Sequence, residues 1–220
     1  MIIAIDGPAA SGKGTLARRL AGHYRLAFLD TGGLYRAAAL HALDRGVDPA
    51  DPAAATAAAR EVRPEDLSDP RLREERVSAA ASVIAAIPAV REALLAFQRD
   101  FAHHPPAGCA GAVLDGRDIG TVVCPDAAVK LFVTASAAAR ASRRFKELQE
   151  SGGNAIYQRV LQDIEQRDAR DRERLAAPLR RADDALELDT TALDPDATFA
   201  RAVALVEAKL AAQRGQASAG

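Results

Sequence analysis

The sequence predicts an α/β fold built on a five-stranded parallel sheet with helices on both faces. Short apolar strands that alternate with helices are typical of such sheets, and 220 residues suit one domain carrying insertions, here expected over residues 1–220. Five apolar segments, each separated from the next by helical sequence, occupy residues 1–5, 26–29, 112–114, 129–133 and 185–188.

Two helices are predicted from their local sequence. Residues 13–24 place Leu16 and Leu20 on one helical face. The last helix is expected to begin at Asp194, a capping residue that proline follows at the first helical position. We expect this helix to end before the polar tail that starts at Arg214.

Two stretches break the alternation, and we interpret both as insertions on the core. Residues 44–92 lack a clear strand and contain several prolines. Residues 151–182 begin with a glycine-rich segment and are crowded with arginine. From residue 140 to residue 181 there are ten arginines and one lysine against seven acids, a net charge of +4.

Composition excludes several classes of function. The 29 basic and 30 acidic residues give a net charge of −1, which excludes the basic surface of a general nucleic-acid-binding protein. No apolar stretch reaches the ~20 residues of a membrane-spanning helix, and we expect no signal peptide and no membrane partner. Cys109 and Cys124 fit two reduced thiols better than a disulfide scaffold or a metal site, so we expect a cytoplasmic protein.

Three predicted strands end at aspartate, namely Asp6, Asp30 and Asp115. Ligands of parallel sheets bind beyond the carboxyl ends of the strands, so we expect the site there. The loop after Asp6 matches GxxxxGK, in which backbone N–H groups, the helix N-terminus and the lysine bind phosphates. The predicted phosphate-binding residues are Gly7, Pro8, Ala9, Ala10, Ser11, Gly12, Lys13, Gly14 and Thr15.

The metal expected at such a loop is Mg²⁺. Gly14 stands where a serine or threonine usually binds the ion, so we expect phosphates and water to hold it, near Thr15 and Asp115, without a dedicated protein metal site. A carboxylate after a hydrophobic run suits this place, although Asp115 could instead cap a turn. A GTPase is excluded, because Asn154 is the only asparagine and no Asn-Lys-x-Asp motif exists.

An arginine-rich face follows in the second insertion. Arg167, Arg170, Asp171 and Arg174 have the spacing of one helical face. A solvated, salt-bridged helix is the plain interpretation. A cationic lid that closes over phosphates is the functional one, and the local charge of +4 favours it.

Four motifs together resemble bacterial cytidylate kinases, which are P-loop nucleoside monophosphate kinases. They are GPxxSGKGT at the phosphate loop, LDTGGLYR at residues 29–36, LDGRDIGTVV at residues 114–123 and RDARDRER at residues 167–174. The four motifs occur in the same order as in that family and together span nearly the whole chain. The last two motifs are the most specific to it. The resemblance implies transfer of the γ-phosphate of ATP to CMP or dCMP with Mg²⁺, in pyrimidine nucleotide metabolism.

The resemblance also implies roles for two segments and for particular residues. Residues 36–92 correspond to the acceptor-binding insertion and residues 151–174 to the lid. The residues implied to carry the transfer are Lys13, Asp115, Arg117, Arg167 and Arg170. The residues implied to bind the acceptor are Thr31, Gly32, Arg36, Ser82, Arg91, Arg117, Asp118, Arg167, Asp171 and Arg174.

Within the acceptor set, the resemblance assigns the monophosphate to Arg36, Arg117 and Arg167. It assigns the cytosine to Ser82, Arg91 and Asp118, the sugar hydroxyl to Asp171, and a place near the base to Arg174. Residues 62–77 are short, charged and broken by proline, so the small sheet that many relatives carry there is expected to be trimmed or absent.

Two other functions stay open at this stage. One is a kinase of the same architecture that phosphorylates UMP, AMP or a small metabolite. The other is a sensor that binds ATP without turnover, against which the arginine lid and the second pocket argue. We expect a monomer whose partners are small molecules.

Overall fold

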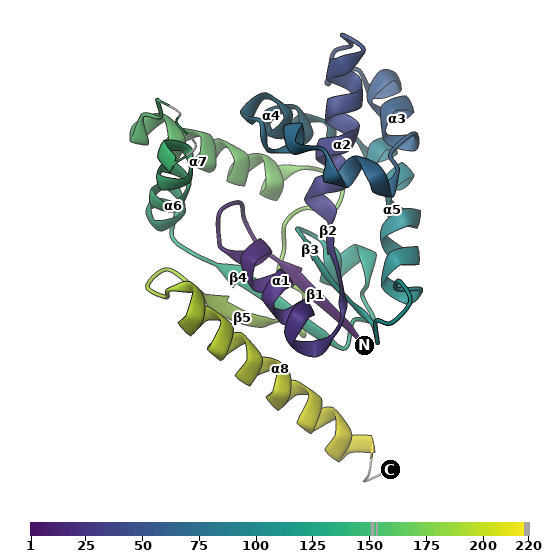
Figure 1. The fold of residues 1–220 in the computed structure, drawn as a ribbon, viewed down its shortest axis with the longest axis vertical. Helices are drawn as coiled ribbons and strands as arrows, with labels where there is room; N and C mark the ends of the chain where they lie inside the picture. Colours follow the sequence, from purple (N-terminus) through teal and green to yellow (C-terminus); the bar gives the residue numbers. More distant parts are fainter. Residues whose placement is uncertain (151, 153, 218–220) are drawn as a thin grey trace.

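A five-stranded, all-parallel sheet lies at the centre of the computed structural model, which describes residues 1–150, 152 and 154–217 (Figure 1). The strand order is β2-β3-β1-β4-β5. The predicted fold class is confirmed, and each strand begins and ends within two residues of its expected bounds. The strands are β1 (Ile2–Asp6), β2 (Ala27–Asp30), β3 (Ala112–Gly116), β4 (Val129–Thr134) and β5 (Leu186–Asp189).

Helices cover both faces of the sheet, because alternate strand residues enter two separate cores. Ile3 and Ile5 of β1 pack with α1 (Lys13–Tyr24) and α8 (Pro195–Ala217) on one face. Ala4, between them, belongs to the core formed with α2 (Thr31–Asp44) and α5 (Pro88–His103). The predicted bounds of α1 are confirmed, and both leucines of its apolar face are buried.

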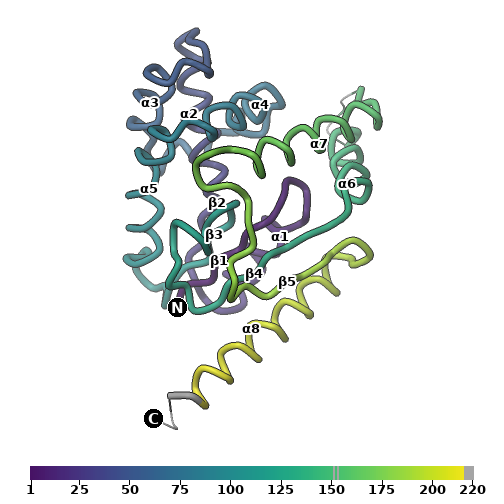
Figure 2. The backbone as a smooth tube through the Cα atoms, turned by 180° about the vertical axis from the view of Figure 1, so that it is seen from behind, coloured from purple at the N-terminus to yellow at the C-terminus, as the bar shows by residue number. Residues whose placement is uncertain are grey.

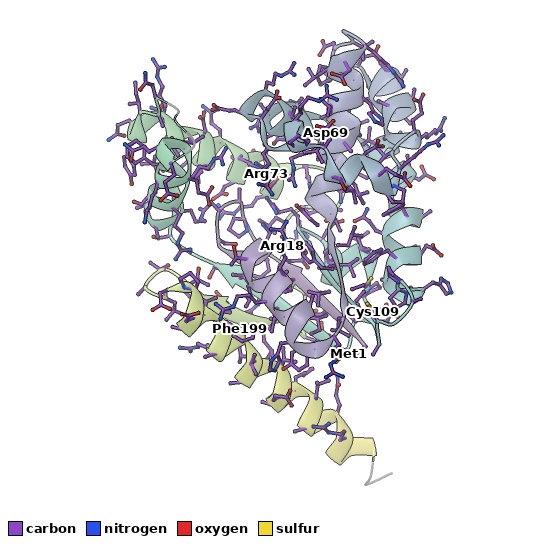
Figure 3. All side chains as sticks on the ribbon, in the orientation of Figure 1. Met1, Arg18, Asp69, Arg73, Cys109 and Phe199 are labelled. Atoms are coloured by element: carbon purple, nitrogen blue, oxygen red, sulfur yellow. The ribbon has the colours of Figure 1, made fainter. Side chains whose placement is uncertain are left out.

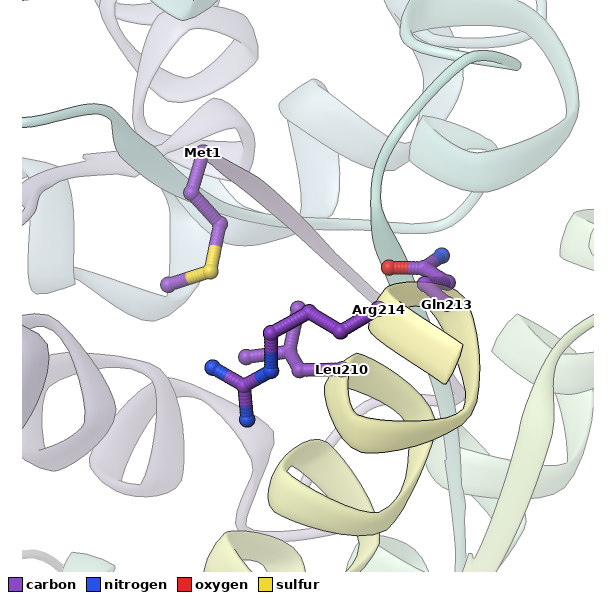
Figure 4. A pocket seen from close by; sticks show the side chains of 4 residues that line it. All are labelled: Met1, Leu210, Gln213 and Arg214. Atoms are coloured by element: carbon purple, nitrogen blue, oxygen red, sulfur yellow. The ribbon is translucent and has the colours of Figure 1, made fainter. Parts of the chain in front are cut away.

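The expected end of the last helix was wrong. Helix α8 continues past Arg214 to Ala217. Alanine and glutamine near this end favour the helix, and the Gln213 side chain donates a hydrogen bond to the Ala128 carbonyl at 2.9 Å. A hollow of about 410 Å³ lined by Met1, Leu210, Gln213 and Arg214 lies here, at the amino edge of the sheet (Figure 4).

Residues 44–92 form helices and no strand, as predicted. The stretch expected to have lost its small sheet begins at the end of α3 (Pro52–Arg60) and forms two short 3₁₀ helices that each start with proline, η1 (Pro64–Ser68) and η2 (Pro70–Arg73). Helix α4 (Glu75–Ile84) follows and packs against α2. No single helix of the described residues is long and apolar enough to cross a membrane, although α4 and α5 pass that test jointly across a 102° bend.

The arginine-rich insertion predicted over residues 151–182 contains one long helix, α7 (Tyr157–Glu173), which lies beside the preceding helix α6 (Ala137–Glu150) above the sheet (Figures 1 and 2). The predicted start of the lid at 151, and residue 153, lie outside the described residues. Arg140 of α6 donates to both carboxylate oxygens of Asp168 on α7, at 3.0 and 2.6 Å. The same guanidinium donates to the Ala9 carbonyl of the phosphate loop at 3.3 Å, so it joins the helix pair to that loop.

Both cysteines are free thiols, as predicted. Cys109 lies beside Met1 at the amino edge of the sheet, away from the carboxyl ends of the strands (Figure 3). Cys124 is buried, and burial raises the pKa of its thiol to about 11, so it stays protonated at neutral pH.

Arg140→Met should lower the free energy of unfolding by about 3–5 kcal/mol, because it leaves the Asp168 carboxylate buried without its cation. Urea denaturation measures this. Arg144→Met on the same helix is the control, because Arg144 makes only a partly exposed pair with Glu147 at 3.3 Å and should cost less than about 1 kcal/mol. Equal losses in the two variants would contradict the role given to the buried pair.

Candidate active site

The three strand-ending aspartates lie side by side at the carboxyl edge of the sheet. Strands β2, β3 and β1 are neighbours, with Asp30 opposite Asp115 and Asp6 opposite Gly116. Each carboxylate has its own partners. Asp30 faces an arginine, Asp115 faces a lysine, and Asp6 accepts two backbone N–H groups. This clustering of charged groups agrees with the expectation that the ligand site lies at the carboxyl edge of the sheet.

The phosphate loop joins β1 to α1 and needs glycine at two places. A Cβ at Gly7 would lie 2.1 Å from the Val133 carbonyl oxygen, and Gly12 has φ 85°. The Gly12 turn lets α1 begin at Lys13, and glycine offers no side chain to cap the helix start. The Lys13 ammonium donates to the Pro8 carbonyl at 3.3 Å and lies 3.7 Å from Asp115 Oδ1. The loop therefore presents a helix N-terminus and a lysine together, which suits an anion.

Buried charge perturbs both members of the Lys13–Asp115 pair. Burial lowers the pKa of Lys13 to about 8, and the nearby Arg117 cation acts in the same direction. Burial raises the pKa of Asp115, against the opposing effect of Lys13. A Cβ at Gly14 would lie 3.1 Å from Asp115 Oδ2, so this close approach gives a physical reason for glycine where a hydroxyl residue is usual.

A second cationic group stands at the start of α2. The Asp30 carboxylate caps this helix by accepting from the Gly33 N–H at 3.1 Å, and it accepts from Arg36 Nη2 at 2.6 Å. Burial of Asp30 raises its pKa, but Arg36 outweighs burial and holds it below the usual range. The Thr31 hydroxyl donates to the Asp115 carbonyl at 2.8 Å, and a Cβ at Gly32 would lie 3.0 Å from Arg36 Nη1.

A hollow of about 270 Å³ lies beside the turn that follows β3. The Asp118 carboxylate accepts from Arg91 Nη2 at 2.5 Å and lies 3.8 Å from Arg174 Nη2. The Arg91 guanidinium also lies over the Tyr35 ring, 5.5 Å from its centroid. The hollow is thus lined by an aromatic ring and a carboxylate held between two arginines, which can receive a flat group that has N–H donors.

The residues of the predicted arginine face differ in their exposure and partners. Asp171 is buried and accepts from Arg117 Nε at 2.9 Å, and Arg174 lies 4.0 Å from it at the end of α7. Burial lowers the pKa of Arg167 to about 10, and Arg117 adds to this effect. Arg170 shares the spacing, but its side chain is exposed in this structure.

Unpartnered polar atoms mark the same region. Among the residues that the structure describes, six side chains have a buried polar atom without a hydrogen-bond partner. Such atoms are costly, so they point to groups that a ligand completes. One of the six is His41, and the other five are predicted site residues: Ser11, Ser82, Asp115, Arg167 and Arg174.

Within the described part of the chain, no cluster of three or more His, Cys, Asp or Glu side chains could hold a metal ion. Beside the phosphate loop, Asp115 of β3 has a buried carboxylate oxygen, Oδ1, without a hydrogen-bond partner. Thr15 is exposed in the first turn of α1. This donor set fits an ion whose remaining ligands are phosphate oxygens and water.

Sequence reasoning missed three groups. Asp6 and Asp30 were recognised only as strand ends, and their flanking glycines were the one available signal. The Arg140–Asp168 pair gave no signal, because its members are 28 residues apart.

Comparisons with known proteins agree with this geometry. Residues 3–208 match the family model described as cytidylate kinase. A cytidylate kinase of Methylobacterium is 63% identical over 209 residues, covering 95% of this chain and 98% of that protein. One of Paramagnetospirillum magneticum is 58% identical over 208 residues, covering 94% and 98%. A solved structure of an uncharacterised protein from Eubacterium ventriosum shares the fold, with a TM-score of 0.53 at 16% identity, covering 94% and 98%.

The affinity for ATP should fall above about pH 8. Lys13 loses its proton with a pKa of about 8, so its charge is present below that pH and is lost above it. The dissociation constant measured by calorimetry should rise by up to about tenfold per pH unit beyond this point. In Lys13→Arg, whose charge persists, the dependence should vanish. A wild-type constant that stays flat through about pH 9 would contradict this role.

Proposed function

The chain belongs to the cytidylate kinase family, and we propose that the site described above transfers the γ-phosphate of ATP to CMP or dCMP, giving ADP and CDP or dCDP. The observation that carries the assignment is the Asp118 carboxylate between Arg91 and Arg174, at a hollow separate from the phosphate loop. A carboxylate is a fitting acceptor for the exocyclic amine of cytosine. A sensor that binds only ATP has no need of this second hollow.

The donor phosphates bind at the loop over residues 7–15. Its backbone N–H groups and the N-terminus of α1 face the phosphates, and Lys13 leaves its contact with Pro8 to reach their outer oxygens. Arg117, Arg167 and Arg170 neutralise charge on the migrating phosphoryl group. No general base is needed, because an oxygen of the acceptor phosphate is already a competent nucleophile.

Mg²⁺ completes this arrangement. Asp115 fits the ion through its buried oxygen without a hydrogen-bond partner, either directly or through water, and Thr15 stands in the adjacent turn. When bound, the ion neutralises charge on the phosphates. Asp115 meanwhile keeps Lys13 aimed at the loop.

The acceptor lies between α2, α4, α5 and the turn after β3. Thr31, Gly32 and Arg36 receive its phosphate together with Arg117 and Arg167. Ser82, Arg91 and Asp118 read the cytosine, and the unpartnered Ser82 hydroxyl supports this place. Asp171 binds the sugar hydroxyl, and Arg174 closes the pocket beside the base.

Residues 36–92 and 151–174 act as an acceptor-binding insertion and a lid on a single domain. Closure of the lid brings Arg170, exposed in this structure, toward the phosphates and excludes water, which suppresses hydrolysis of ATP. Two free thiols support a cytoplasmic location. We expect the enzyme to act as a monomer, which size-exclusion chromatography tests.

The direct test of the function is ADP release from Mg-ATP with CMP, dCMP, UMP, AMP or no acceptor. Strong turnover on CMP and dCMP with weak turnover on UMP supports both the reaction and the assigned base contacts. Turnover on UMP or AMP instead would keep a kinase and overturn those contacts. Without acceptor-dependent release, only the phosphate loop would remain assigned.

Arg36→Ala should raise the KM for CMP by about tenfold or more with little change in the KM for ATP, because a charged hydrogen bond to the acceptor phosphate is lost. Steady-state kinetics with each substrate varied in turn measures this. Arg45→Ala is a matched control, because Arg45 follows the same helix and its partner is the exposed Glu61. Equal losses for both substrates in Arg36→Ala would contradict the assignment.

A further inference from the structure

The carboxylate of Asp6 spans the boundary between the two halves of the site. Asp6 is the last residue of β1, and the phosphate loop begins at the next residue. Its Oδ1 accepts from the Ile119 N–H at 2.7 Å and its Oδ2 from the Gly120 N–H at 2.8 Å. Those two N–H groups directly follow Asp118. One carboxylate therefore contacts the backbone of the base-reading turn while its own backbone leads into the phosphate loop.

The contact supplies hydrogen-bond acceptors for the first N–H groups of a helix. Ile119 and Gly120 open a single turn of π-helix, η3 (Ile119–Val123), and first-turn N–H groups need acceptors from outside the helix. The residue before a helix usually supplies one, but the Asp118 side chain accepts none of them. Its oxygens face Arg91 and Arg174 instead.

The residues that make this contact are buried from solvent. Asp6 is 5% exposed and Ile119 is fully buried. A Cβ at Gly120 would lie 3.0 Å from Lys130 Cδ and 3.4 Å from Asp6 Oδ2, so the turn rests directly on the Lys130 stem. Loss of either acceptor oxygen would leave a buried N–H group without a partner.

We propose that Asp6 is a positioning residue for recognition of the base: it caps η3 from the central strand, which leaves the Asp118 carboxylate free to bind the cytosine amine. This rests on the proposed function. Asp6 itself touches neither substrate in this scheme and acts only through Asp118. It also links the donor loop to the turn that carries Asp118, because its backbone leads into the loop and its carboxylate holds that turn.

The test is a double-mutant cycle on the full chain. Asp6→Asn keeps the size of the side chain but turns an amide NH₂ toward one backbone N–H. We expect the KM for CMP to rise by about tenfold or more, the KM for ATP to stay within about twofold, and the preference for CMP over UMP to fall. In an Asp118→Asn background, the same change should cost less than about twofold, because the two residues act as one unit.

Additive effects in the cycle, equal increases in both KM values, or an unchanged KM for CMP would each overturn the proposal. Asp194→Asn is the matched control, because Asp194 lies outside both insertions, caps the exposed start of α8 by accepting from the Asp196 and Ala197 N–H groups at 2.9 and 2.7 Å, and should leave the kinetics unchanged. If Asp6→Asn does not fold, Gly120→Ala replaces it. This variant presses η3 against Lys130 with Asp6 intact, and it should show the same split between the KM values. Wild-type enzyme without CMP-dependent ADP release would refute the proposed function instead.

Discussion

Three aspartates end three neighbouring strands, Asp6 and Asp115 buried and Asp30 half-buried, and carboxylates so close together are tolerated only when each has its own compensating partner. Two backbone N–H groups serve Asp6, Arg36 serves Asp30, and Lys13 serves Asp115. Because these partners come from η3, α2 and α1, the requirement to compensate the carboxylates draws three elements to one edge of the sheet. The phosphate loop, Arg36 and the turn that carries Asp118 are placed by this one constraint.

The same principle extends to the ion pairs in and around α7. Asp171 holds Arg117, Asp118 holds Arg91 with Arg174 nearby, and Asp168 holds Arg140. Each pair aims a guanidinium before any substrate binds, so less side-chain entropy is lost on binding. Arg167 is the exception, because its buried Nε has no hydrogen-bond partner and its pKa is lowered by burial beside Arg117. Its Nε–H is therefore available to an incoming acceptor group.

Local sequence was sufficient for the features that depend on neighbouring residues. The strands, the phosphate loop and the start of α8 follow from apolar runs, glycines and an Asp-Pro cap. The residues proposed to bind the acceptor were predicted only from the resemblance of the motifs to a known family. The partnership of Asp6 with η3 could not be predicted, because 113 residues separate Asp6 from Ile119. Arg170 has the spacing of the site face yet is exposed, because at about 100° per residue it lies on the margin of that face, about 100° around the helix from the buried Asp171.

The central claim is that the carboxylates at the carboxyl edge of the sheet fix the positions of the neighbouring cations, which the proposed binding of phosphate requires. Calorimetric titration of Asp30→Asn with CMP tests it most directly, because asparagine can still cap α2 at Gly33 but no longer holds Arg36 as an ion pair. The account predicts weaker binding than in the wild type, since Arg36 loses its fixed position. If Asp30 merely repelled the acceptor phosphate, its removal would tighten binding. Affinity that is equal to or higher than that of the wild type would therefore contradict the account.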